Sequence, residues 1–309
     1  MINIVGKRYF FFGLSLLVII PGLIFLALGG MKPGIDFTGG SLLEVRFTSA
    51  ILPSPDQIVT LYNQAGFVDT KVQTSGSDLL IIRSSDMTDQ KKSELIGEMQ
   101  TRFGNGKPVT EQSFETVGPS VGKEVTTQAA IAVAAAAVAI TIYITIAFRG
   151  VDNAFRYGIS AIIAMIHDIL VVVGVEAILG KVLGWEADSL FLTALLTVIG
   201  FSVHDTIVVF DRIRENAKIY RRIPYETLVN HSIVQTLDRS INTQMTVMIT
   251  LLALTLFGGI TIRHFVLILL IGVFSGTYSS IFNAASILVV WENKDWKKWF
   301  RRRDETVPA

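Results

Sequence analysis

The sequence contains no cysteine and few charged residues. None of its 309 residues is Cys, and Asp, Glu, Lys and Arg together make up 17%. The absence of cysteine excludes disulfides, thiolate nucleophiles and Cys-ligated metal sites. The formal net charge is only +1, and the basic residues form no stripe, so nothing indicates nucleic acid as a partner.

Motifs for catalysis are also missing. The chain has no G-x-x-x-x-G-K-[ST] phosphate-binding loop, and no nucleophile can be paired with a base. His231 and His264 fall near loop ends, where a surface or interface position is expected rather than a metal ligand. We therefore expect neither enzymatic activity nor a metal or organic cofactor.

Long apolar runs dominate what is present, since hydrophobic residues make up 50% of the chain. A bilayer core of about 30 Å needs about 20 apolar residues per helix. The first run follows Lys7 and Arg8 and resembles a signal peptide, but it is long for one and its end makes a poor cleavage site. We expect six transmembrane helices, at 9–28, 128–148, 157–179, 189–209, 240–257 and 265–291.

Basic residues are distributed unevenly among the connections. The short loops on one side contain only Lys181 and Arg263. By the positive-inside rule, both termini are cytoplasmic and the polar segment lies outside. The expected organisation is 1–30 for the N-terminus and first helix, 31–123 for an outer domain, 124–291 for helices two to six, and 292–309 for a basic cytoplasmic tail. The basic residues of the cytoplasmic side are Lys7, Arg8, Arg149, Arg156, Arg212, Arg214, Lys218, Arg221, Arg222, Lys294, Lys297, Lys298, Arg301, Arg302 and Arg303.

The outer segment has the patterns of a small α+β domain. Ser54, Pro55 and Gln57 form the start of a helix with a capping box. A second helix is expected at 88–103. Strands are expected at 41–47, 67–74, 78–83 and 110–117. The resulting β-α-β-β-α-β order predicts a ferredoxin-like domain.

Asp168 and Asp205 interrupt the apolar runs. A charged side chain at a helix centre costs roughly 2.5–3.5 kcal/mol, so each must have a partner or a water-filled path. Asp168 lies near the middle of the third helix, and His167 should point about 100° away around the helix. The pattern leaves open whether Asp168 is a hydrogen-bonded structural residue or a proton site.

Asp205 follows His204 in the fourth helix, toward its cytoplasmic end. Arg239 opens the fifth helix from the same side, and Thr243 lies one turn further on, so we expect Arg239 to be the counter-ion of Asp205. An opposite charge within about 4–6 Å favours the ionised carboxylate. The pair therefore either controls a proton or is a static ion pair that fixes helix packing. Further polar residues at this opening should face helices or water rather than lipid; they are Asn242, Gln244 and Thr246.

Glycines mark three further segments. Gly34, Gly39 and Gly40 permit positive φ, and Asp36 is expected to cap the turn that they form. We expect a turn here, with a hinge as the alternative, and a linker at 118–122. The G-x-x-x-G pattern at 272–276 predicts close packing of the sixth helix.

Three motifs in order resemble the SecF family, the smaller membrane subunits of the bacterial SecDF translocase accessory complex. They are G-I-D-F-T-G-G at 34–40, V-G-P-S-V-G at 117–122 and H-D-T-I-V-V-F-D-R-I-R-E at 204–215. The resemblance covers nearly the whole chain and includes the six helices and the large first loop. It implies membership of the resistance-nodulation-division (RND) superfamily, with these six helices forming half of a twelve-helix bundle shared with SecD.

The resemblance also implies a function and partners. SecDF uses the proton gradient to assist export of preproteins through the SecYEG channel of the inner membrane, and YajC and YidC are further candidate partners. By position, Asp205, Arg239 and Thr243 resemble the proton-relay residues of the family, with Asp168 ranked second. This chain has His204 where the family often has Asn.

Two other classes of function are also compatible with acids inside the membrane helices. A proton-coupled small-molecule exporter of the same superfamily should show two large outer loops and twelve spans, which this chain lacks. A non-conducting scaffold would use the acids only for packing, and it should still function when they are replaced by isosteres.

Overall fold

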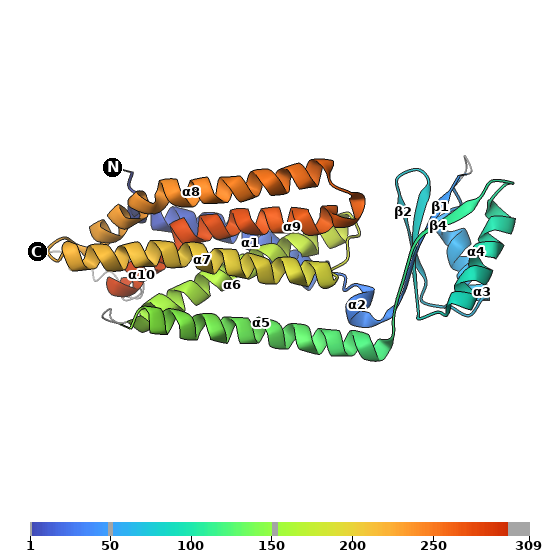
Figure 1. The fold of residues 1–309 in the computed structure, drawn as a ribbon, viewed down its shortest axis with the longest axis horizontal. Helices are drawn as coiled ribbons and strands as arrows, with labels where there is room; N and C mark the ends of the chain where they lie inside the picture. The colour runs from blue at the N-terminus through green and yellow to red at the C-terminus, as the bar shows by residue number, and fades with distance from the viewer. Residues whose placement is uncertain (1, 49–51, 150–153, 296–309) are drawn as a thin grey trace, which may run out of the picture. The chain divides into compact units, whose positions relative to one another are not determined.

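The computed structural model describes residues 2–48, 52–149 and 154–295, which form two compact units (Figure 1). The helical unit comprises residues 1–31, 132–185 and 190–309. The sheet unit comprises residues 32–131 and 186–189. Most of the predicted basic tail, from residue 296 onward, lies outside the described residues.

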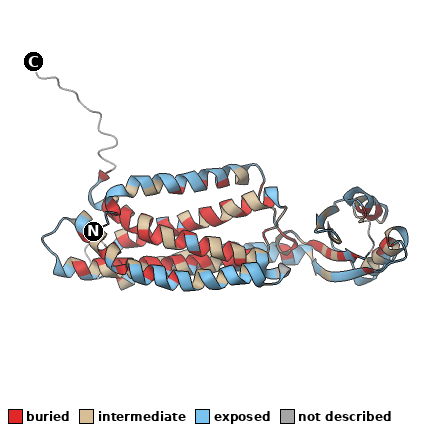
Figure 2. Ribbon diagram, turned by 90° about the horizontal axis from the view of Figure 1, so that it is seen from above, coloured by how far each residue is buried: buried red, intermediate tan, exposed pale blue. Residues whose placement is uncertain are grey.

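The six predicted membrane spans are confirmed as long apolar helices. In the helical unit they run alongside one another, and buried residues gather on the third, fourth and sixth spans, whereas the second and fifth are largely exposed (Figure 2). Their bounds are α1 (Arg8–Ala27, after the 3₁₀ turn η1, Val5–Lys7), α5 (Pro119–Ala147), α6 (Ala154–Val182), α7 (Ser189–Ile219), α8 (Tyr225–Phe257) and α9 (Ile260–Tyr278), which continues into η2 (Ser279–Ala284) and α10 (Ala285–Glu292).

Two helices, α5 and α8, begin well before their predicted starts. The expected linker at 118–122 is wrong, because α5 begins at Pro119, whose fixed φ suits a first helical position. The fifth span was expected from residue 240, but α8 begins at Tyr225. Its first turns are amphipathic and bury Leu228, Val229 and Ile233, so hydropathy alone misses them.

Glycines let two pairs of helices in the bundle approach closely. A β-carbon at Gly22 of α1 would lie 2.6 Å from the Cα of Gly174 on α6. On α9, a β-carbon at Gly272 would overlap the side chain of Val198, and one at Gly276 would lie 3.2 Å from Ser202 Cβ. The predicted close packing of the sixth span is therefore confirmed, against α7.

The sixth span contains a π-helical segment, η2. Such segments are rare and occur frequently at functional sites. Ser279 and Ser280 open it, and both are completely buried. Their hydroxyl groups contribute to the polar centre described below.

The sheet unit has the predicted β-α-β-β-α-β order. Its four strands are antiparallel in the order β2-β3-β1-β4, an arrangement compatible with a ferredoxin-like domain. The capping box of α3 forms, with Gln57 Oε1 accepting from Ser54 N at 2.9 Å. The elements are α2 (Ile35–Thr38), β1 (Gly40–Phe47), α3 (Pro55–Gln64), β2 (Lys71–Ser75), β3 (Leu79–Ser84), α4 (Asp89–Phe103) and β4 (Val109–Val117).

The core of the sheet unit lies between the sheet and helices α3 and α4, which cover one face (Figure 1). The second strand was expected from residue 67 but begins at Lys71. Phe67 instead follows Gly66, which has a φ of +97°, and its ring packs on Tyr62. The largest contributors to this core are Leu43, Phe47, Ile58, Leu61, Tyr62, Leu80, Ile82, Leu95 and Met99.

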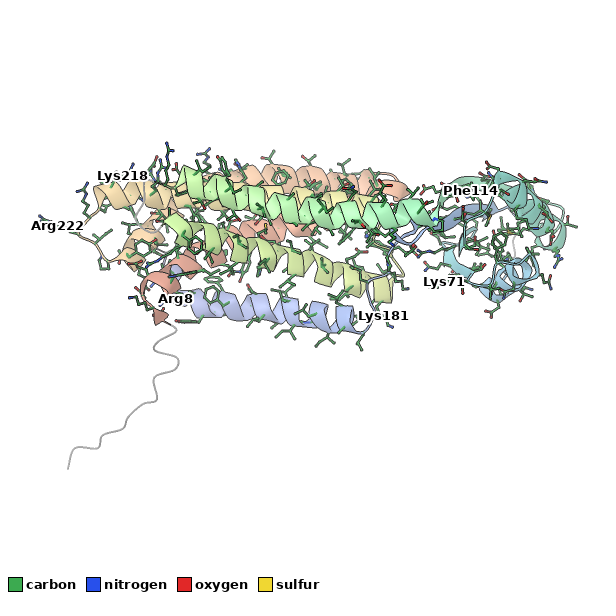
Figure 3. All side chains as sticks on the ribbon, turned by 90° about the horizontal axis from the view of Figure 1, so that it is seen from below. Arg8, Lys71, Phe114, Lys181, Lys218 and Arg222 are labelled. Atoms are coloured by element: carbon green, nitrogen blue, oxygen red, sulfur yellow. The ribbon has the colours of Figure 1, made fainter. Side chains whose placement is uncertain are left out.

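Basic side chains are distributed unequally between the two ends of the helical unit. Lys218 and Arg222 lie at the same end as Arg8, whereas Lys181 lies at the opposite end (Figure 3). This distribution agrees with the unequal loop charges of the sequence.

Candidate functional site

Asp168 of α6 is completely buried and accepts hydrogen bonds from α7 and from the sixth span. Its Oδ2 accepts from Ser202 Oγ at 2.5 Å and Ser279 Oγ at 2.6 Å, and its Oδ1 accepts from Ser275 Oγ at 2.8 Å. Nδ1 of His167 lies 3.0 Å from Oδ1, so the rotation between neighbouring positions does not keep these side chains apart. A carboxylate offers about four lone-pair sites, which these contacts fill.

Further hydroxyl groups extend this polar centre along α7. Ser280 Oγ lies 2.9 Å from Thr206 Oγ1 and donates to the carbonyl of Ser202 at 3.0 Å. The polar contacts thus reach from Asp168 to the residue next to Asp205. Within the described ranges, no group of three or more His, Asp and Glu side chains is placed to hold a metal ion.

Asp205 is 4% exposed, and its described partner is Gln244 of α8, whose Nε2 lies 2.5 Å from Asp205 Oδ2. The expected ion pair with Arg239 is not formed in the described part of the chain. Arg239 and Thr243 are both exposed, and Thr243 Oγ1 donates to the Arg239 carbonyl at 2.9 Å. Successive helical positions differ by about 100°, so the face with Gln244 meets α7 while the face with Arg239 does not.

Polar residues follow one exposed face of α8. They recur at helical spacing, with Arg239 at one end, and a charged or polar face is costly against lipid. This face therefore needs water or another protein surface in the membrane. Its exposed members are Arg239, Asn242, Thr243, Thr246 and Thr250.

The glycine motif at 34–40 is tightly packed within the sheet unit. Gly39 and Gly40 have φ of +74° and +123°, confirming the expected need for positive φ. A β-carbon at Gly39 would lie 2.8 Å from Pro119 Cα, and one at Gly40 would lie 2.6 Å from the Ser84 carbonyl oxygen. A β-carbon at Gly122 of α5 would lie 2.7 Å from the Gly39 nitrogen. Only glycine fits these positions, and the hinge motion stays a prediction.

Asp36 does not cap its own turn. Its Oδ2 accepts a hydrogen bond at 2.8 Å from the backbone nitrogen of Ser189, the first residue of α7. Gly34 precedes the short helix α2 as its N-cap, with φ of −69° rather than a positive value, and its nitrogen donates to the Ala187 carbonyl at 2.6 Å. A carboxylate is favourable at this place, because the N-terminus of a helix attracts negative charge. Its partner lies 153 residues away, which no local pattern indicates.

Arg83 of β3 contacts both the glycine motif and the segment before α7, and no sequence pattern indicates these contacts. It pairs with Glu186 at 2.7 Å and donates to the Pro33 carbonyl at 2.9 Å and to Thr38 Oγ1 at 2.7 Å. One guanidinium thus joins the sheet, the glycine motif and the segment before α7. Its position in an ordinary strand carries no signal of this role.

The fold and the buried acids define a polytopic membrane protein with six spanning helices, a polar centre inside the helical unit and one small α+β unit. The family model for "Protein export membrane protein SecD/SecF, C-terminal" matches residues 98–294, and that for the "SecD/SecF GG Motif" matches residues 24–51. The chain belongs to the SecD/SecF family of protein-export membrane proteins.

Curated relatives and a solved structure agree with this membership. The protein translocase subunit SecF of Anaerolinea thermophila is 58% identical, and that of Thermobaculum terrenum is 50% identical, each over 100% of both chains. The crystal structure of SecDF from Thermus thermophilus, a translocon-associated membrane protein, matches with a TM-score of 0.80 and 32% identity. That match covers 94% of this chain and 39% of the SecDF chain.

Proposed function

We propose that this chain is the SecF-type subunit of a complex that uses the proton gradient to assist protein export through the Sec channel. The observation that carries the proposal is Asp205, a carboxylate buried in a membrane helix with one described partner. Holding such a group in a membrane is costly, which favours a functional role. The relatives, which are named translocase subunits, support the same conclusion.

Protons serve as the coupling ion in this proposal, and no other cofactor is required. Asp168, with its four contacts, suits a fixed hydrogen-bonded centre and ranks second to Asp205 as a proposed relay residue. Asp205, with one contact, has capacity to gain and release a proton. One charge crossing the membrane gains about 2.3 kcal/mol per 100 mV, so a few protons suffice for a domain movement.

Arg239 and Thr243 complete the proposed relay at the exposed face of α8. The polar residues of that face support a partner with its own membrane helices, which we propose to be SecD. In that complex Arg239 approaches Asp205 in one stage of the cycle and withdraws in another. The Sec channel SecYEG and the translocating preprotein are the further proposed partners, together with YajC and YidC.

The proposed location is the bacterial inner membrane with both termini in the cytoplasm. The cluster of basic side chains at the Arg8 end of the helical unit supports this orientation (Figure 3). The sheet unit then lies outside, where an exported chain emerges.

Replacement of Asp205 tests the proposal. Asp205→Asn preserves shape but cannot ionise, so we expect normal assembly and a fall of gradient-dependent export to the level without a gradient. Export of a preprotein is measured in vesicles that contain the Sec channel and SecD, with and without a proton gradient. Asp211→Asn is the matched control, because Asp211 is on the same helix, is half-exposed and pairs with Arg214 at 3.5 Å. Full gradient-dependent export by Asp205→Asn would identify a scaffold.

A further inference from the structure

Glu176 of α6 is a third buried carboxylate in the helical unit. Its side chain is 0% exposed, and its Oε2 lies 2.8 Å from Nε2 of His264 on α9, whose side chain is 20% exposed. Its Oε1 is buried and has no hydrogen-bond partner among the described residues. The His264 ring packs on Trp185, with 4.5 Å between ring centroids. The histidine expected at a surface or interface is thus half-buried and paired with an acid.

We propose that Glu176 and His264 form a second proton-binding site, on which one proton is shared between carboxyl and imidazole. This site goes beyond the proposed relay at Asp205 and does not depend on it. With one proton the pair is net neutral, the least costly state for two buried groups. Loss of that proton leaves a buried carboxylate without a counter-charge, and gain of a second leaves a buried cation. His264, the partly exposed member, is the point at which the proton enters and leaves.

The surrounding helices supply few other charges. α1 has no titratable residue after Tyr9, α7 has none before His204, and α8 has none after Arg239. On α6 and α9 the charged residues nearest in sequence to the pair are Lys181 and Arg263, of which Arg263 is exposed, whereas His167 and Asp168 lie about two turns before Glu176. The proton on the pair is therefore governed chiefly by the two partners themselves.

A change of charge on the Glu176–His264 pair should displace α9 rather than α1. Gly174, two residues before Glu176, is in close contact with Gly22, so the α1 side of α6 has no room to shift. Any rearrangement on protonation is accommodated on the side of His264.

The fluorescence of Trp185 reports this site directly. The full chain is placed in lipid nanodiscs with the substitutions Trp291→Phe, Trp296→Phe and Trp299→Phe, which leave one indole. Imidazolium quenches an indole that it contacts, whereas neutral imidazole quenches it weakly. The intensity should therefore follow the proton occupancy of His264 as the pH is changed.

Glu176→Gln should move the midpoint of this titration down by about one pH unit or more, because a nearby opposite charge shifts such equilibria by about 1–3 units. His264→Asn should abolish the titration. Arg263→Gln is the matched control, since it removes a neighbouring exposed charge without touching the pair, and it should not lower the midpoint. An unchanged midpoint in Glu176→Gln, or no titration in the parent chain, would overturn the proposal.

Infrared spectroscopy gives an independent measurement if Glu176→Gln does not fold. In His264→Asn the shared proton has no imidazole to bind, so the carboxyl of Glu176 should retain it. The expected result is a new protonated-carboxyl band at neutral pH that is absent from the parent. Without that band, Glu176 is an ordinary hydrogen-bond acceptor.

Discussion

Asp168 and Asp205 have the same side chain in two different environments. Four contacts surround the Asp168 carboxylate, whereas Asp205 has Gln244 as its described partner. Hydrogen bonds to a charged group contribute about 1.5–3 kcal/mol each, and a buried donor that loses its acceptor costs about 1–3 kcal/mol. The two residues should therefore differ in what their replacement does to stability.

We predict that Asp168→Asn destabilises the helical unit by about 1–3 kcal/mol, because one oxygen that accepts hydroxyl donors becomes an amide. Asp205→Asn should cost clearly less, since the amide of Gln244 can turn to suit it. Thermal unfolding of the purified chain in detergent compares the two. Equal losses would mean that the number of described contacts does not distinguish the two acids.

In the sheet unit, a half-buried carboxyl provides a pH test. Burial, and secondarily the negative charge of Glu115, raises the pKa of Glu44 above its ordinary value. The folded state therefore binds this proton more tightly than the unfolded chain does, and stability falls as pH rises through the ordinary pKa toward the raised one.

Glu44→Gln should accordingly stabilise the sheet unit at neutral pH, by less than about 1 kcal/mol for a partly solvated site. In acid the substitution should have no such effect, because the Glu44 carboxyl is then protonated in both the folded and the unfolded chain. Denaturant unfolding at neutral and acidic pH measures the difference. Asp69→Asn, at an exposed position of the same unit, is the control for removing a carboxylate that is not buried. A gain that is as large in acid as at neutral pH would rule out the electrostatic explanation.

At the scale of elements, α7 is capped by a side chain that is distant in sequence. The Asp36 carboxylate accepts from the first backbone nitrogen of α7, the helix that carries Ser202 and Asp205. The first N–H groups of a helix have no partner within it, so an acceptor at this position stabilises the helix start.

Asp36→Ala should loosen the first turn of α7 by about 0.5–2 kcal/mol, the usual cost of losing such a cap. Asp36→Asn keeps an acceptor oxygen and should lose much less. Hydrogen exchange of the Ser189 amide and its neighbours measures both variants. Unchanged protection in Asp36→Ala would show that this contact does not hold the helix start.

For the whole molecule, the distribution of basic residues predicts orientation. The helical unit has Lys218 and Arg222 at the Arg8 end, which the positive-inside rule assigns to the cytoplasm (Figure 3). The sheet unit is reached through connections that should lie on the other side.

The sequence has no cysteine, so single introduced cysteines can test this orientation. Gln90→Cys in α4 should react with an impermeant thiol reagent added outside intact cells, whereas Lys218→Cys in α7 should react only after the membrane is opened. The reverse labelling pattern would invert the orientation and remove the sheet unit from the outer side.

The sequence by itself determined the six spans, the order of elements in the sheet unit and the presence of Asp168 and Asp205 within the membrane helices, whereas the buried Glu176 emerged only in the structure. These depend on hydropathy, helix caps and residue alternation, which are local properties of the chain. Only the tertiary structure decided the partners of those acids. Ser202, Ser275 and Ser279 lie 34, 107 and 111 residues from Asp168, and Gln244 rather than Arg239 meets Asp205. Each successive residue turns a helix by about 100°, so the side chains that meet depend on how each helix is rotated and packed in the bundle.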